Sequence, residues 1–190
     1  NPSQYPVENG AVYPTTSFGT QLKEVAQLIK SKVGLQMACV DIGGWDHHAN
    51  ISTFLPPLLD ELAKGLLAFN TDMGATMNKV TVITMTEFGR RVKENASGGT
   101  DHGAGSAMLL MGGGVVGGQV YAEWPGLADS NLFNGDLDVT VDYRTVLNEL
   151  LHKRCRDGNA EGQFPGFEPG PWLGCFKKAN VENYDYPNPP

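Results

Sequence analysis

The chain has 190 residues, of which 41% are hydrophobic and 18% charged, a composition typical of a globular domain with a hydrophobic core. Its formal net charge of −7 argues against a nucleic-acid-binding surface. No apolar run reaches the roughly 18 residues that a membrane-spanning helix needs.

Three segments of different character divide the chain. Residues 1–13 are polar and rich in proline, which predicts a lead or linker, and the start without Met or signal peptide suggests a processed or partial chain. Residues 14–155 carry the regular patterns of one α/β domain. Residues 156–190 are rich in Gly, Pro and aromatics. This irregular C-terminal arm either wraps its own domain or docks on a partner chain.

Three amphipathic helices are predicted, over residues 15–32, 56–73 and 142–151. Thr16 or Ser17 suits the N-cap of the first helix. The second is expected to start at the Pro-Pro pair, since proline is tolerated in a first helical turn. The apolar positions that carry the three patterns are Leu22, Val25, Ala26, Ile29, Leu58, Leu59, Leu62, Leu66, Phe69, Tyr143, Val146, Leu147, Leu150 and Leu151.

Short apolar runs at residues 35–44, 80–85 and 107–115 predict buried strands. Because strands that are apolar throughout alternate with helices, we expect a mostly parallel sheet covered on both faces. The predicted fold is a three-layer α/β/α sandwich.

The three cysteines lie in two kinds of context. Cys39 sits in an apolar run and is predicted to be a buried thiol. Cys155 and Cys175 flank a Gly/Pro-rich segment and are either a disulfide in an oxidising compartment or two free thiols.

The stretch GWDHHAN follows the first predicted strand, where α/β sheets bind ligands. Asp46 and His48 are two residues apart, so in an extended chain both side chains point to the same side. A carboxylate and an imidazole suit zinc, manganese or iron better than calcium. The alternative is an ordinary surface Asp–His pair.

Two further polar stretches follow along the chain. TEFGRR comes just after the second predicted strand, where Glu87 occupies a place like that of Asp46. Arg90 suits phosphate or sulfate oxygens, although a Glu–Arg ion pair within the loop is the alternative. In GGTDHG, glycines flank Asp101 and His102 and let the backbone approach a ligand closely. Together the three stretches predict one pocket that binds a divalent metal and an anion.

These stretches, with VTVITM before TEFGRR and MLLMGGGVVGGQVYAEWPGL after GGTDHG, resemble the domain-of-unknown-function 1501 family over roughly residues 14–152. That family is usually grouped with the alkaline-phosphatase-like and sulfatase-like superfamily, whose members are α/β/α sandwiches. The resemblance implies Asp46, His48 and His102 as metal ligands, and Asp101 as a ligand or an orienting residue. Glu87 stands where relatives carry the acid of an Asp–His pair.

This sequence departs from the family pattern in two ways. The family commonly has threonine at the position of His47, which is therefore an additional ligand or an exposed substitute. Related hydrolases also carry their nucleophile in an N-terminal half to which no residue here corresponds, and no Ser, Thr or Cys has a convincing nucleophile context.

The leading hypothesis is a metal-dependent hydrolase of phosphate or sulfate esters that uses zinc, or else manganese or iron. Glu87 and Arg90 would be its catalytic residues, and an N-terminal half or second chain would complete the domain. The alternative is a non-catalytic secreted module that binds a partner. The resemblance further implies a bacterial periplasmic or secreted location.

Overall fold

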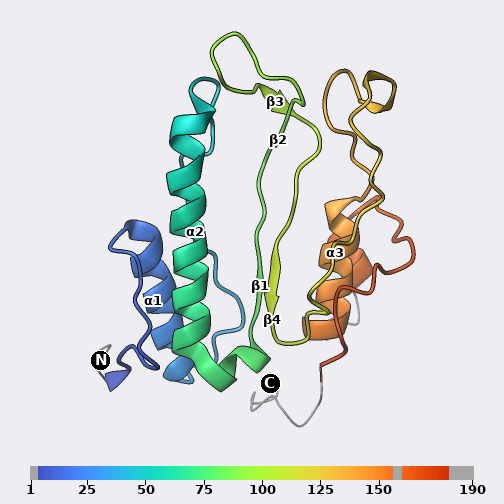
Figure 1. The fold of residues 1–190 in the computed structure, drawn as a ribbon. Coiled ribbons are helices and arrows are strands. Elements are labelled where there is room, and N and C mark those ends of the chain that lie inside the picture. Colours follow the sequence, from blue (N-terminus) through green and yellow to red (C-terminus); the bar gives the residue numbers. More distant parts are fainter. Residues whose placement is uncertain (1–3, 156–159, 180–190) are drawn as a thin grey trace. The chain divides into compact units, whose positions relative to one another are not determined.

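A computed structural model describes residues 4–155 and 160–179 (Figure 1). The chain divides into two compact units, and both are discontinuous in sequence. Unit 1 comprises Asn1–Met77 and Asn95–Thr100, and unit 2 comprises Asn78–Glu94 and Asp101–Pro190. None of the helices in the described part of the chain is both long and apolar enough to span a membrane.

Unit 1 contains the helix pair α1 (Ser17–Lys30) and α2 (Ile51–Met73), which pack against each other. The predicted first helix is confirmed, with Thr16 as its N-cap, because the Thr16 hydroxyl accepts a hydrogen bond from the Gly19 N–H at 3.2 Å. Gly65 lets the helices approach closely, since a Cβ there would lie 2.4 Å from the Phe18 ring. The buried apolar residues of this unit are Phe18, Leu22, Ala26, Ala68, Phe69, Met73 and Met77.

The prediction that the second helix starts at its Pro-Pro pair is wrong. Helix α2 begins at Ile51, and Pro56 and Pro57 lie inside it. The early start is supported from outside the helix by a segment that we call the strap, residues 95–100. The Asn50 and Ile51 N–H groups donate to strap carbonyls at 3.1 and 2.8 Å, which satisfies donors that a helix start leaves without partners.

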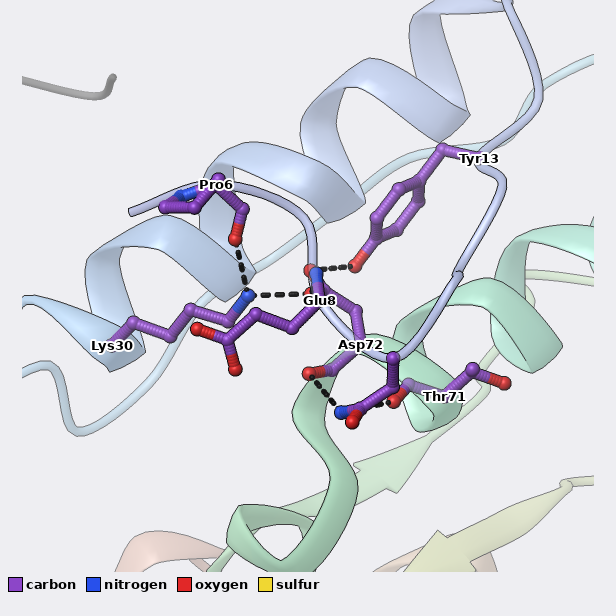
Figure 2. A network of polar contacts seen from close by, with 7 residues as sticks. Pro6, Glu8, Tyr13, Lys30, Thr71 and Asp72 are labelled. Atoms are coloured by element: carbon purple, nitrogen blue, oxygen red, sulfur yellow. Dashed lines mark hydrogen bonds and ion pairs between the residues drawn. The ribbon is translucent and has the colours of Figure 1, made fainter. Parts of the chain in front are cut away.

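A buried carboxylate near the end of α2 joins three parts of unit 1 (Figure 2). Asp72 accepts hydrogen bonds from the Glu8 N–H at 2.6 Å, from the Tyr13 hydroxyl at 2.9 Å and from the Lys30 ammonium group. Lys30 also donates to the Pro6 carbonyl at 2.8 Å. Burial raises the pKa of Tyr13 well above its usual range, and the hydrogen bond to Asp72 adds to this shift. Residues 6–13 of the polar lead are therefore held against both helices.

Unit 2 contains two small sheets, and the predicted three-layer sandwich with a mostly parallel sheet is wrong. Strand β1 (Thr81–Ile83) pairs antiparallel with β4 (Leu110–Gly112), and β2 (Gly89–Arg90) pairs antiparallel with β3 (His102–Gly103). Parallel pairing needs a crossover of a dozen or more residues, usually a helix. The chain between β1 and β4 forms no helix and instead returns alongside β1 (Figure 1). In the described residues both sheets are therefore two-stranded.

The first predicted strand is also absent from these sheets. Residues 35–44 take no strand conformation, and Met37 within them is 74% exposed. The predicted burial of Cys39 is wrong, since this thiol is exposed. The reason is that an apolar run becomes a buried strand only when a neighbouring strand pairs with it.

Unit 2 has its core around helix α3 (Tyr143–Leu150), which the sequence predicts and which continues into the π-helical turn η4 (Leu151–Cys155). Val146, Cys175 and Phe176 form the buried centre. The short 3-10 helices η2 (Gly74–Lys79), η3 (Asp129–Asn131) and η5 (Ala160–Gln163) lie elsewhere along the chain.

Residues 174–176 of the C-terminal arm pack within unit 2 through a second buried carboxylate. Glu149 accepts hydrogen bonds from the Gly174 and Phe176 N–H groups, both at 3.1 Å, and from the Lys153 ammonium group at 2.7 Å. Over these residues the arm wraps its own domain. Cys155 and Cys175 form no disulfide with each other. Burial raises the pKa of Cys175 to about 11, with a contribution from the nearby Glu149 carboxylate.

Candidate functional site

Asp46 and His48 lie just before helix α2, in an irregular segment of unit 1. The His48 Nε2 atom lies 2.9 Å from the Asp46 Oδ1 atom. Both side chains are accessible, with 58% of Asp46 and 49% of His48 exposed. The Trp45 indole donates to the Ile42 carbonyl at 2.7 Å and so fixes the chain just ahead of them. A carboxylate oxygen and an imidazole nitrogen this close can bind the same cation.

His47 lies apart from this accessible pair. It is only 7% exposed, and its ring stacks on Phe54 with centroids 5.9 Å apart. Among the described residues no group hydrogen-bonds to its Nδ1 atom. The alternative that His47 is an exposed substitute for threonine is therefore wrong, while a role as an additional ligand stays a prediction.

The strap binds the backbone of the GWDHHAN stretch, within unit 1. The Thr100 N–H donates to the His47 carbonyl at 3.2 Å, and the Asn95 side-chain amide donates to the His48 carbonyl at 2.9 Å. A Cβ at Gly99 would lie 2.3 Å from the His48 carbonyl carbon, so the two backbones are in direct contact. The first half of GGTDHG is thus docked on GWDHHAN.

Replacing Gly99 by alanine is expected to lower the free energy of unfolding by about 1–3 kcal/mol, because the methyl group overlaps backbone that cannot move aside freely. Urea unfolding followed by circular dichroism measures the loss. Gly43→Ala is the matched control, since a Cβ at Gly43 meets nothing within 4 Å. Equal unfolding midpoints for the two variants would contradict the strap contact.

The second half of GGTDHG pairs with TEFGRR, within unit 2. In the β2–β3 ladder Gly89 lies opposite Gly103 and Arg90 lies opposite His102. The Arg91 N–H donates to the Asp101 carbonyl at 3.0 Å. Because directly opposite residues project to the same face of an antiparallel pair, the Arg90 and His102 side chains are neighbours.

An aromatic side chain that the sequence analysis did not single out joins this pair. The Phe88 ring stacks on His102 with centroids 4.2 Å apart and an interplanar angle of 11°. The Arg90 guanidinium carbon lies 4.7 Å from the centroid of the same ring. The only sequence feature that could have indicated Phe88 is its position between Glu87 and the strand that carries Arg90.

The other charged residues of the three stretches are accessible or form contacts elsewhere. Glu87 and Asp101 are both exposed. Arg91 forms an ion pair with Asp136 at 3.4 Å and donates to the Asn134 carbonyl, so its guanidinium serves the neighbouring loop. Arg90, beside His102, is the better placed of the two arginines for an anion.

The family model described as a protein of unknown function, DUF1501, matches residues 13–156. The chain belongs to the DUF1501 family. The resemblance seen in the sequence is thereby confirmed at the level of the family. No curated protein and no solved structure matches the chain. Because the family description names no activity, the function of this DUF1501 chain has to be inferred from the site itself.

Proposed function

We propose that this DUF1501 chain contributes a metal site to a hydrolase of phosphate or sulfate esters. The observation that carries the proposal is the hydrogen bond from the Thr100 N–H to the His47 carbonyl. Thr100 is only two residues before His102, and consecutive Cα atoms are about 3.8 Å apart. Along the chain, Asp101 and His102 thus directly follow a residue that is hydrogen-bonded to the segment bearing Asp46 and His48.

The donor set fits a divalent transition metal. One carboxylate and two imidazoles suit zinc first, with manganese or iron as alternatives, and leave coordination positions for water and substrate. Asp101 is either a further ligand or an acceptor that orients a ligand. When bound, a divalent ion supplies Lewis-acid activation of an ester oxygen and of water.

Two side chains of unit 2 supply the other chemistry. Arg90, opposite His102 in the β2–β3 ladder, presents a guanidinium that can donate two parallel hydrogen bonds to phosphate or sulfate oxygens. Glu87 is an accessible carboxylate next to Phe88 and can accept or return a proton during ester cleavage.

The proposed kinship with alkaline-phosphatase-like and sulfatase-like enzymes rests on these loop motifs alone, since the described sheets are small and antiparallel. The same resemblance supports a proposed bacterial periplasmic or secreted location.

A non-catalytic module that binds a partner chain is the second candidate. The accessible segment 35–44 favours it, because an apolar run that leaves Met37 exposed offers a hydrophobic surface to another polypeptide. Under this proposal the metal site would be structural or vestigial.

Hydrolysis of aryl phosphates and aryl sulfates by the chain together with the N-terminal half or second chain that completes the domain separates the two candidates. A hydrolase shows turnover that stops when a chelator removes the metal and returns when zinc is added back. Glu87→Gln is then expected to lower kcat by about 10²–10⁴-fold, the usual contribution of a general acid or base. Glu94→Gln is the control, because Glu94 is an exposed acid outside the three stretches. Zinc binding without turnover favours the binding module, and absence of both overturns the proposed hydrolase.

A further inference from the structure

Phe88 contacts both side chains that the proposed function places in unit 2. It immediately precedes β2 and is only partly exposed. Its ring lies nearly parallel to the His102 imidazole, at 4.2 Å, and the Arg90 guanidinium carbon lies 4.7 Å from its centroid. Phe88 offers no metal ligand and no hydrogen bond, so its contribution is to the positions of the other two.

The contact with Phe88 bears directly on the orientation of the His102 ring. The residue is exposed and lies on a strand of only two residues. An exposed imidazole samples several rotamers, and a ligand that must be fixed during metal binding loses affinity through the entropy of that ordering. A parallel aromatic ring in contact with the imidazole favours one orientation of its plane before any metal arrives.

The Arg90 side chain is long and has many rotamers, so the position of its guanidinium also depends on the contacts that it makes. Contact of its guanidinium with an aromatic face is a cation–π interaction, which favours positions of the guanidinium over the ring. The same ring therefore holds the guanidinium near the imidazole, on the face that the two residues share in the β2–β3 ladder.

We propose that Phe88 is a positioning residue, which orients the His102 imidazole as a metal ligand and holds the Arg90 guanidinium beside it. This inference rests on the proposed function, since it assigns His102 to the metal site. It adds a residue that neither the loop motifs nor the family description assigns.

The test combines three variants with two measurements on the full chain. Phe88→Leu removes the ring, Phe88→Tyr keeps it, and Phe133→Leu is the control, since Phe133 is an exposed phenylalanine of the same unit outside the three stretches. The first measurement is the NMR shift of the His102 ring protons in the metal-free chain, which an overlying ring moves upfield. The second is the zinc dissociation constant from calorimetry.

Phe88→Leu is expected to move the His102 ring protons downfield and to weaken zinc binding about 10–100-fold, the range typical of residues that orient a ligand. Phe88→Tyr and Phe133→Leu should keep both values, and all variants should keep the wild-type circular dichroism spectrum. Unchanged zinc affinity in Phe88→Leu, with wild-type binding intact, overturns this inference alone. A wild-type chain that binds no zinc overturns the proposed function and the ligand role of His102 together.

Discussion

Replacing Asp72 by alanine is expected to lower the free energy of unfolding by about 3–5 kcal/mol, because removal of one partner leaves the other charge buried without compensation. The side chains of Asp72 and Lys30 are only 1% and 12% exposed. The variant also leaves the Glu8 N–H and the Tyr13 hydroxyl without their acceptor. These losses add to that of the ion pair, since each buried donor without a partner is costly.

Asp60→Ala is the matched control for this effect. Asp60 lies on the same helix and also pairs with a lysine, Lys64, but these side chains are 58% and 64% exposed. Exposed pairs contribute about 0–1 kcal/mol, so the control should remain close to wild type. Denaturant unfolding of both variants measures the difference. If Asp72→Ala and Asp60→Ala lowered the free energy of unfolding by similar amounts, the buried network around Asp72 would not stabilise unit 1 as we infer.

Because of Tyr13, the contribution of this network to the free energy of unfolding depends on pH in the alkaline range. Its pKa lies above the ordinary value of 10.0 in the folded chain because of burial and of the hydrogen bond to Asp72. The folded state thus favours the protonated phenol, and this contribution is complete below pH 10 and declines as the pH rises further.

Removal of a proposed metal ligand is expected to weaken zinc binding by more than about 100-fold, beyond the 10–100-fold typical of residues that only orient a ligand. Asp46→Ala and His102→Ala should each show this loss in calorimetric titrations of the metal-free chain, since each removes one of the three proposed protein ligands. The two residues lie in different units of the chain, so agreement between the variants would link GWDHHAN to GGTDHG through one ion.

His152→Ala is the control for the ligand variants. His152 is an exposed histidine of unit 2 whose ring lies 4.7 Å from that of Trp172, away from the three stretches along the chain. Its replacement should leave zinc affinity unchanged. Wild-type affinity in His102→Ala would instead restrict any metal site to Asp46 and His48.

The helices were the part of the fold that local sequence patterns could predict. The i, i+3, i+4 spacing around Leu22 and the hydroxyl of Thr16 are local features, and α1 follows both. The start of α2 was not predictable in the same way. It depends on hydrogen bonds from Asn50 and Ile51 to a strap more than 40 residues further along the chain.

Strand pairing could not be predicted for a related reason. An apolar run such as 80–85 indicates a strand, and β1 lies within it, but the run does not specify its partner or direction. Direction depends on the connection, and the chain after β1 carries loops and β2–β3 rather than a crossover helix. Residues 35–44 have the same apolar character as the second run and yet enter neither sheet.

At the candidate site, the amino-acid sequence indicates the polar stretches but not the contacts that organise them. Side chains alternate between the two sides of an extended chain, which predicts that Asp46 and His48 point to the same side. Their side chains do lie within hydrogen-bond distance of each other. The burial of His47 could not be foreseen, because it results from stacking on Phe54. The contact of Phe88 with His102 likewise requires knowledge of the β2–β3 register.

The strap also determines how this chain can be divided for experiments. The chain passes into unit 2 at Asn78, and it belongs to unit 2 again from Asp101 onward. Residues 95–100, which lie between these two parts of unit 2 in the sequence, belong to unit 1. A truncated chain that ends at Met77 would lack the carbonyls that receive the Asn50 and Ile51 N–H groups, and the start of α2 would fray. Neither unit can therefore be excised as a continuous piece, and changes in residues 95–100 act on a helix that begins more than 40 residues earlier.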